Sequence, residues 1–166
     1  MTRPYVFRTR WLVDEPPEPL WDTLEDLLAQ PDPMPWWGAV RVVGRGVEPG
    51  AAGPGQGDVV HLEARSAFGY RLRFTVHDLE LERPTAMRLN ASGDLVGHAA
   101  LAFAPVGPAG SPRRTRLTID WRVVATPAWM RRGDLLLRPV FVLGHGLIMR
   151  RGERRLNAWL ATRRRR

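Results

Sequence analysis

The sequence predicts an α+β protein in which a curved antiparallel sheet of about seven strands wraps around a long C-terminal helix, with a short helical insert after the first strand. Apolar residues recur at every second position through the middle of the chain, as in half-buried strands. The stretches between them are short or rich in Gly and Pro, which is typical of hairpins. The C-terminal part then changes to a helical period.

The first predicted elements are a strand, a helix and a second strand. Residues 5–13 mix β-branched and aromatic residues with arginine and end at DEPPEP. Residues 19–30 place leucines on one stripe of a short helix, which Pro31 stops. The stretch PDPMPWWGAV allows only a helical turn before a strand at about 40–47, and EPGAAGPGQG is a loop.

Five further strands follow, each with one apolar and one polar face. The alternation is clearest where Tyr70, Leu72 and Phe74 interleave with arginines and a threonine. The five stretches are DVVHLEARS, YRLRFTVHDLELE, MRLNAS, LVGHAALAF and TRLTIDWRV. A single apolar sheet face needs a cover, and only the last helix is long enough to provide it.

The C-terminal helix is predicted to begin after TPAW, with its apolar residues near one stripe. Arg150, Arg154 and Arg163 lie on the opposite side. Pro139 must either kink this helix or divide a preceding helical piece from the main one. The apolar stripe contains Leu137, Phe141, Gly144, His145, Ile148, Gly152, Leu156 and Trp159.

The length predicts one domain, residues 1–162, followed by the basic tail 163–166, which we expect to fray into solvent. The net charge is +8, but all 25 basic residues are arginine, as in proteins from GC-rich bacterial genomes. Charge is therefore a weak indication of function. The arginines are spread over strands, loops and tail, so we expect no specific nucleic-acid partner.

Cysteine is absent, which excludes disulfides, thiolate catalysis and zinc–thiolate sites in this sequence. The four histidines show no metal-ligand spacing, so neither a metal nor a cofactor is expected. There is no signal-peptide core, and the most apolar run is interrupted by Arg138, Pro139 and His145. We expect a cytoplasmic protein without a transmembrane segment.

The sequence resembles the polyketide cyclase/dehydrase-like proteins of the START and birch-pollen-allergen (SRPBCC) superfamily over nearly its whole length. The resemblance depends on RWLVDEPPEPLWDTLEDL, on PWWGAV before the second strand, and on GHGLIMRRGERRL in the last helix. It implies the helix-grip fold and a pocket for a hydrophobic or aromatic small molecule. Many members carry Asn before and Asp after the helix histidine, whereas this chain has Gly144 and Gly146.

His145 is the candidate catalytic residue, because its helical position turns it toward the sheet, where an imidazole can act as acid, base or hydrogen-bond donor. The alternative is a histidine that merely packs in the core. The candidate ligand-binding residues share a place on the predicted inner faces or at the rim, and packing is again the alternative for them. They are Trp36, Trp37, Tyr70, Leu72, Phe74, Leu89, Trp121, Phe141 and Ile148.

The predicted function is binding of a small hydrophobic or aromatic molecule, polyketide-like or lipid-like, between the last helix and the sheet. A cyclase or dehydratase activity is compatible with this, although the sequence supplies no second catalytic group. A non-catalytic carrier or interaction protein, including a homodimer, is one alternative. An arginine-driven binder of RNA or of a membrane surface is another.

Overall fold

The computed structural model describes residues 3–47, 57–111 and 113–165, with the side chains of all of them except 134–137. Most of the loop predicted between the second and third strands, residues 48–56, therefore lies outside the described residues. The elements follow one another as β1 (Tyr5–Val13), α1 (Pro17–Leu28), β2 (Val40–Val47), β3 (Asp58–Arg65), β4 (Arg71–Glu82), β5 (Ala86–Gly93), β6 (Leu95–Val106), β7 (Arg114–Ala125), α2 (Ala128–Arg132) and α3 (Asp134–Arg163).

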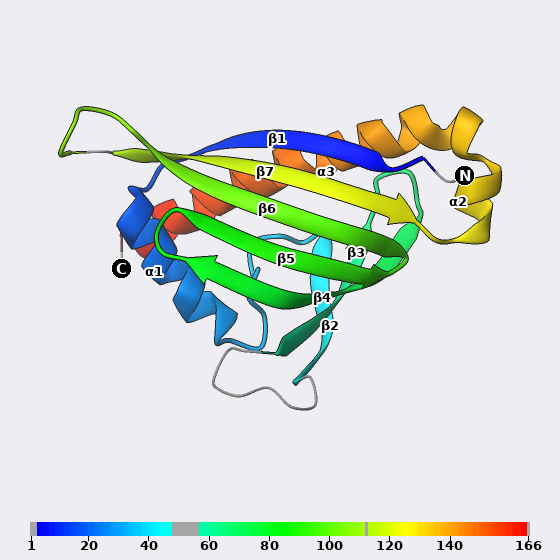
Figure 1. Ribbon diagram of the computed structural model, residues 1–166. Coiled ribbons are helices and arrows are strands. Elements are labelled where there is room, and N and C mark those ends of the chain that lie inside the picture. The colour runs from blue at the N-terminus through cyan, green and yellow to red at the C-terminus, as the bar shows by residue number, and fades with distance from the viewer. Residues whose placement is uncertain (1–2, 48–56, 112, 166) are drawn as a thin grey trace.

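The seven strands form one antiparallel sheet in the order β1-β7-β6-β5-β4-β3-β2, and α3 lies along its inner side (Figure 1). Register shifts in β2 between Val42 and Gly44, and in β4 between His77 and Glu80, bend these strands. Gly97 permits a close approach of β6 to β7, because a Cβ there would lie 2.0 Å from the carbonyl oxygen of Arg122. The predicted seven-stranded helix-grip architecture is confirmed.

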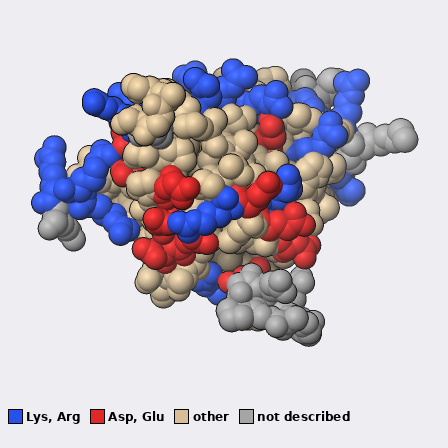
Figure 2. Space-filling model, turned by 60° about the vertical axis from the view of Figure 1, so that its left-hand side comes forward, with Lys and Arg blue, Asp and Glu red and all other residues tan. Residues whose placement is uncertain are grey.

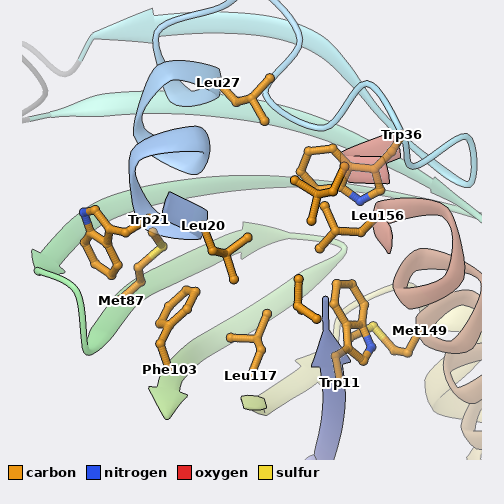
Figure 3. Packing of buried hydrophobic residues seen from close by; sticks show 12 residues of the cluster. Trp11, Leu20, Trp21, Leu27, Trp36, Met87, Phe103, Leu117, Met149 and Leu156 are labelled. Atoms are coloured by element: carbon orange, nitrogen blue, oxygen red, sulfur yellow. The ribbon is translucent and has the colours of Figure 1, made fainter. Parts of the chain in front are cut away.

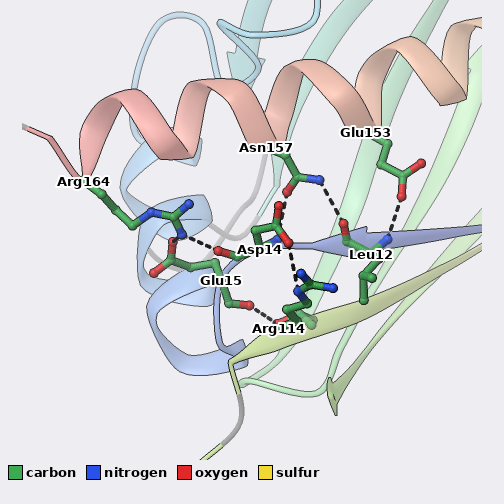
Figure 4. Close-up of polar contacts among 8 residues, drawn as sticks. Leu12, Asp14, Glu15, Arg114, Glu153, Asn157 and Arg164 are labelled. Atoms are coloured by element: carbon green, nitrogen blue, oxygen red, sulfur yellow. Dashed lines mark hydrogen bonds and ion pairs between the residues drawn. The ribbon is translucent and has the colours of Figure 1, made fainter. Parts of the chain in front are cut away.

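Polar side chains of α3 hold its C-terminal half against β1 (Figure 4). β1 is an edge strand, so the outward N–H and C=O groups of its last residues need partners other than a strand. The backbone N–H of Leu12 donates to Glu153 Oε1 at 2.7 Å, and its carbonyl accepts from Asn157 Nδ2 at 2.9 Å. Arg164, in the segment predicted to fray, forms an ion pair with Glu15 at 2.9 Å.

A hydrophobic core fills the end of the sheet where α1 packs (Figure 3). Leu20 and Trp21 of α1 are completely buried, and the Trp21 ring meets Phe103 of β6 edge to face at 5.3 Å. On α3, Gly152 allows close packing, since a Cβ there would lie 2.8 Å from the Trp37 ring. The buried members are Trp11, Val13, Leu20, Trp21, Leu27, Trp36, Met87, Phe103, Leu117, Met149, Leu156 and Leu160.

The outer face of the sheet carries the polar residues of the alternating strands. Glu63 of β3 is nevertheless completely covered, because three arginines fold over its carboxylate. Arg65 and Arg73 donate through Nε at 2.9 and 3.1 Å, and Arg41 lies 3.1 Å away. These contacts, led by the Arg65 hydrogen bond, lower the pKa of Glu63 from 4.5 to about 2.

Charge is unevenly distributed over the surface. On one face, acidic side chains gather in the middle and arginines occupy the margins (Figure 2). Asp22 and Glu25 of α1 pair with Arg83 from the β4–β5 turn, and the Arg83–Glu25 distance is 2.7 Å. Part of the positive charge is thus neutralised locally.

Two details of the C-terminal region differ from the prediction. The helical region divides at Gly133, between α2 and α3, while Pro139 lies inside α3 within its first two turns. Phe141 and Leu156 of the predicted inner stripe are buried, whereas the side chain of Leu137 lies outside the described residues. The outer side is not uniformly basic, however, because Leu143 and Leu147 are exposed there.

Candidate functional site

A cavity of about 270 Å³ lies between the N-terminal half of α3 and the inner face of the sheet. Residues from every strand, from α2 and from the segment after α1 contribute to its wall. The wall is almost entirely apolar because the strands alternate: the residues between the lining positions carry arginine, histidine and carboxylate groups to the outer face. The cavity is therefore a direct product of the period-two pattern.

Nearly all of the predicted site residues line this cavity. His145, Phe141 and Ile148 reach it from α3, and Trp37 reaches it from the segment between α1 and β2. Their roles in binding remain predictions. The sheet contributes Tyr70, Leu72, Phe74, Leu89 and Trp121.

Trp36 is the exception among the predicted residues, because it does not line the cavity. It is buried in the core cluster at 5.5 Å, between ring centroids, from Trp159 of α3. Its neighbour Trp37 does face the cavity and donates its indole N–H to the carbonyl of Ile148 at 3.3 Å. The two adjacent tryptophans therefore have separate positions, one in the core and one in the cavity wall.

The His145 ring packs flat against Phe7 of β1, with 3.9 Å between the ring centroids and an interplanar angle of 17°. Its Nε2 atom is buried, and no residue in the described ranges forms a hydrogen bond with it. Burial disfavours the charged form and lowers the pKa of His145 from 6.5 to about 4. The imidazole is consequently neutral at pH 7, and it can accept a proton or hydrogen bond but is a poor proton donor.

Two hydroxyl groups lie beside His145 at the same end of the cavity. A Cβ placed on Gly144 would be 2.6 Å from Tyr70 Oη and 3.1 Å from Ser66 Oγ, and both of these residues line the cavity. The absence of a side chain at Gly144 thus makes room for these hydroxyls against α3. With His145 next in the chain, they give the apolar cavity one polar end.

Sequence reasoning missed several lining residues, including Ser66, Phe7 and Met130. Phe7 had a usable signal, because it alternates with Tyr5 along the first strand and both face inward. Ser66 stands where β3 gives way to the β3–β4 turn, and Met130 belongs to α2, which the sequence did not resolve as a separate helix. Ser66 lies two residues after the inward-facing Ala64, so the alternation could have found it, whereas Met130 carried no such signal.

Known structures share this arrangement of sheet and helix. The ZhuI aromatase/cyclase from a Streptomyces species superposes with a TM-score of 0.65 and 18% identity, covering 99% of this chain and 97% of that one. A Thermus thermophilus protein gives a TM-score of 0.61 and 18% identity, covering 93% and 98%. The chain therefore shares the fold of these two proteins.

The di-domain aromatase/cyclase BexL also has this fold, with a TM-score of 0.56 and 13% identity over 93% of this chain and 49% of that chain. Identities this low concern the fold alone. At the level of sequence, neither a protein-family model nor a curated protein matches the chain.

The described residues also show whether the chain offers a membrane-spanning helix or a cluster of metal ligands. None of the helices there has the length and apolar character needed to cross a membrane. Among the same residues, no three His, Cys, Asp or Glu side chains gather closely enough to hold a metal ion. His145 and the hydroxyls of Tyr70 and Ser66 provide polar groups in the otherwise apolar wall of the cavity.

Proposed function

We propose that this protein binds a small, mainly apolar molecule in the cavity beneath α3. The observation that carries the proposal is the cavity of about 270 Å³ with an apolar wall and a few polar atoms at one end. Such concave, apolar spaces with few polar groups are the usual sites of small-molecule binding. The shared fold of the aromatase/cyclases is consistent with this function.

The volume limits the size of the bound molecule. A cavity of about 150 Å³ accommodates benzene, and drug-sized ligands occupy about 300–1,000 Å³. The cavity of about 270 Å³ therefore fits one or two aromatic rings, or an aliphatic chain of similar bulk. A long multi-ring polyketide would require α3 to move outward.

The polar end gives the bound molecule an orientation. His145 is neutral at pH 7 and presents a lone pair, whereas the hydroxyls of Tyr70 and Ser66 can donate or accept. A phenol or alcohol with its hydroxyl at this end satisfies these groups and leaves its hydrocarbon part against the apolar wall. Small phenolic or hydroxylated ring compounds are the class that fits best.

A cyclase- or dehydratase-like activity is the second candidate, and the unpartnered Nε2 of His145 favours it. The lowered pKa assigns His145 the role of base, because the neutral imidazole predominates at physiological pH. The hydroxyls of Tyr70 and Ser66, which also line the cavity, are then the candidates for supplying a proton. In this version a ketone-bearing ring precursor loses a proton to His145 while bound in the cavity.

The binding proposal is tested with a panel of naphthols, simple phenols and medium-chain alcohols, together with the fluorescent two-ring probe 1-naphthylamine, which is neutral at pH 7. A ligand present at 100 times its Kd should stabilise the protein by about 2.7 kcal/mol, which raises Tm by roughly 5–10 °C for a chain of this length. Displacement of the probe then ranks the ligands.

Two matched variants locate the binding site. Ala99→Phe adds a ring to the cavity wall, and Ala104→Phe makes the same change at an exposed position of the same strand. The ring at residue 99 occupies much of the free volume, so Kd should rise at least about tenfold, while the variant at 104 should bind as the wild type does. Equal binding by both variants, or no binding by the wild type, would overturn the proposal.

The catalytic candidate is separated from simple binding by His145→Gln. A binder retains most of its affinity in this variant, since Gln still offers a hydrogen-bond acceptor. A catalyst loses turnover of a ketone-bearing ring precursor, and the wild-type rate should fall as pH drops toward about 4. Turnover that is the same with and without His145 would exclude it as the base.

A further inference from the structure

An apolar patch is formed by exposed side chains of α2, α3 and the β3–β4 turn, three segments that meet at one end of the molecule (Figure 1). It consists of Phe68, Trp129, Leu143 and Leu147, whose exposed fractions are 51%, 47%, 61% and 38%. Isolated exposed apolar residues are ordinary, but a group of large ones from three neighbouring segments marks an interaction surface.

Contacts beneath the apolar patch link it to the cavity. The Trp129 ring lies 5.7 Å from Phe141 and 6.1 Å from Tyr70, and both of those rings line the cavity. Phe68 packs beside Gly144, because a Cβ there would lie 3.4 Å from Phe68 Cδ2. The patch therefore covers the polar end of the cavity.

Arginines continue the same side of α3 beyond the apolar patch. At 100° per residue, Arg150 and Arg154 fall on the line of Leu143 and Leu147, and all four side chains are exposed. Residues 138–155 contain five arginines and a single acid, Glu153, which is turned toward β1 and accepts from the backbone of Leu12. The outer surface of α3 is thus apolar in its first part and basic in its second.

We propose that this surface docks the protein on an anionic phospholipid membrane, with α3 parallel to the membrane plane. A helix that presents Leu and a neighbouring Trp beside arginines is suited to the boundary between headgroups and acyl chains. Each arginine near an anionic leaflet adds electrostatic attraction.

The charges favour a membrane over a second copy of this chain. In a twofold pairing, a second copy of this surface would offer leucines and arginines but no acid to the arginines of the first. The acids that the chain offers on α1 are already paired with Arg83. An anionic bilayer offers negatively charged headgroups to the arginines and hydrocarbon to the apolar side chains.

Co-sedimentation with lipid vesicles tests the proposal. The protein should bind vesicles containing about one third phosphatidylglycerol far better than pure phosphatidylcholine vesicles, and binding should weaken as salt increases. Leu143→Ser with Leu147→Ser should lower the partition coefficient at least about tenfold, since it removes the inserted hydrocarbon. Arg150→Gln with Arg154→Gln should lower it about fivefold for each charge.

Matched pairs elsewhere on the surface serve as controls. Val43→Ser with Val96→Ser changes exposed apolar residues on the sheet, and Arg116→Gln with Arg122→Gln removes exposed arginines from β7. These pairs should bind vesicles like the wild type. An unchanged Tm in every variant shows that the protein remains folded.

Several outcomes would overturn the membrane proposal. These are the absence of binding to anionic vesicles, an equal loss in the control pairs, or binding that depends only on Arg165 and Arg166 of the tail. Sedimentation equilibrium that reveals a dimer abolished by Leu143→Ser with Leu147→Ser would assign the patch to a second copy instead. Binding of 1-naphthylamine should persist in that variant, so failure at the membrane leaves the cavity proposal intact.

Discussion

The burial of His145 predicts a specific dependence of stability on pH. Its pKa is about 4 in the folded protein and 6.5 when the ring is exposed in the unfolded chain. Because the folded pKa is the lower one, the unfolded chain binds the proton more tightly between these values. Protonation therefore favours unfolding as pH falls below about 6.5, and the full effect is reached below pH 4.

The two pKa values set the size of the effect. From about pH 7.5 to about pH 5.5, the unfolded chain becomes protonated at this position while the folded protein does not, which removes about 1.4 kcal/mol of stability. By pH 4 the loss reaches about 3 kcal/mol. Glu63 does not interfere in the upper window, because its contribution is lost only as pH falls from 4.5 toward 2.

Urea unfolding of the wild type and of His145→Gln measures this contribution. The free energy of unfolding is obtained at several pH values for both proteins, and the difference between them is plotted against pH. All other titrating groups cancel in that difference, which should change by about 1.4 kcal/mol between about pH 7.5 and pH 5.5. A flat difference would mean that His145 titrates normally, and the reasoning from its burial against Phe7 would be refuted.

Three further changes test the packing and electrostatics of the fold. In urea unfolding, Gly144→Ala should be less stable than Gly146→Ala by about 2 kcal/mol. A Cβ at 144 meets Tyr70 Oη, whereas nothing lies within 4 Å of a Cβ at 146. Equal stabilities would contradict the close contact at Gly144. Trp21→Ala should lower the free energy of unfolding by about 3–5 kcal/mol, since the side chain is completely buried against Phe103, and a loss below 1 kcal/mol would disprove that packing. Glu63→Gln should be less stable than the wild type at neutral pH. It should also lack the wild-type loss of stability between pH 4.5 and about 2, because the carboxylate contributes only while ionised. An acid-unfolding profile that matches the wild type would count against the arginine cluster.

The sheet and the inner face of α3 were predictable because local periodicity determines them. The alternation of Leu72, Phe74 and their neighbours fixed which side chains face inward, and the cavity wall followed from that alternation. The N-terminal boundary of α3 was harder to predict from the sequence. Pro139 is a strong local signal, yet α3 tolerates it within its first two turns, and the break occurs at Gly133.

Side-chain contacts between distant segments account for the remaining differences. Trp36 and Trp37 are adjacent and chemically identical, so only the packing of α3 decides that Trp36 enters the core and Trp37 the cavity wall. The covering of Glu63 requires arginines from three strands, which no single stretch of sequence reveals. Ser66 joins the polar end only because Gly144 of α3 lies against it.

Gly152 packs closely against Trp37 and Trp11, and the two halves of α3 on either side of it differ in which substitutions they can accept. Beyond it, Glu153 and Asn157 fasten the helix to β1, and substitutions there act mainly on folding. Before it, the helix roofs an empty space, and new side chains reshape that space while the anchor stays in place. Within one continuous helix, the residues after Gly152 therefore determine stability and the residues before it determine which ligand fits. Redesign of the cavity can begin N-terminal to Gly152.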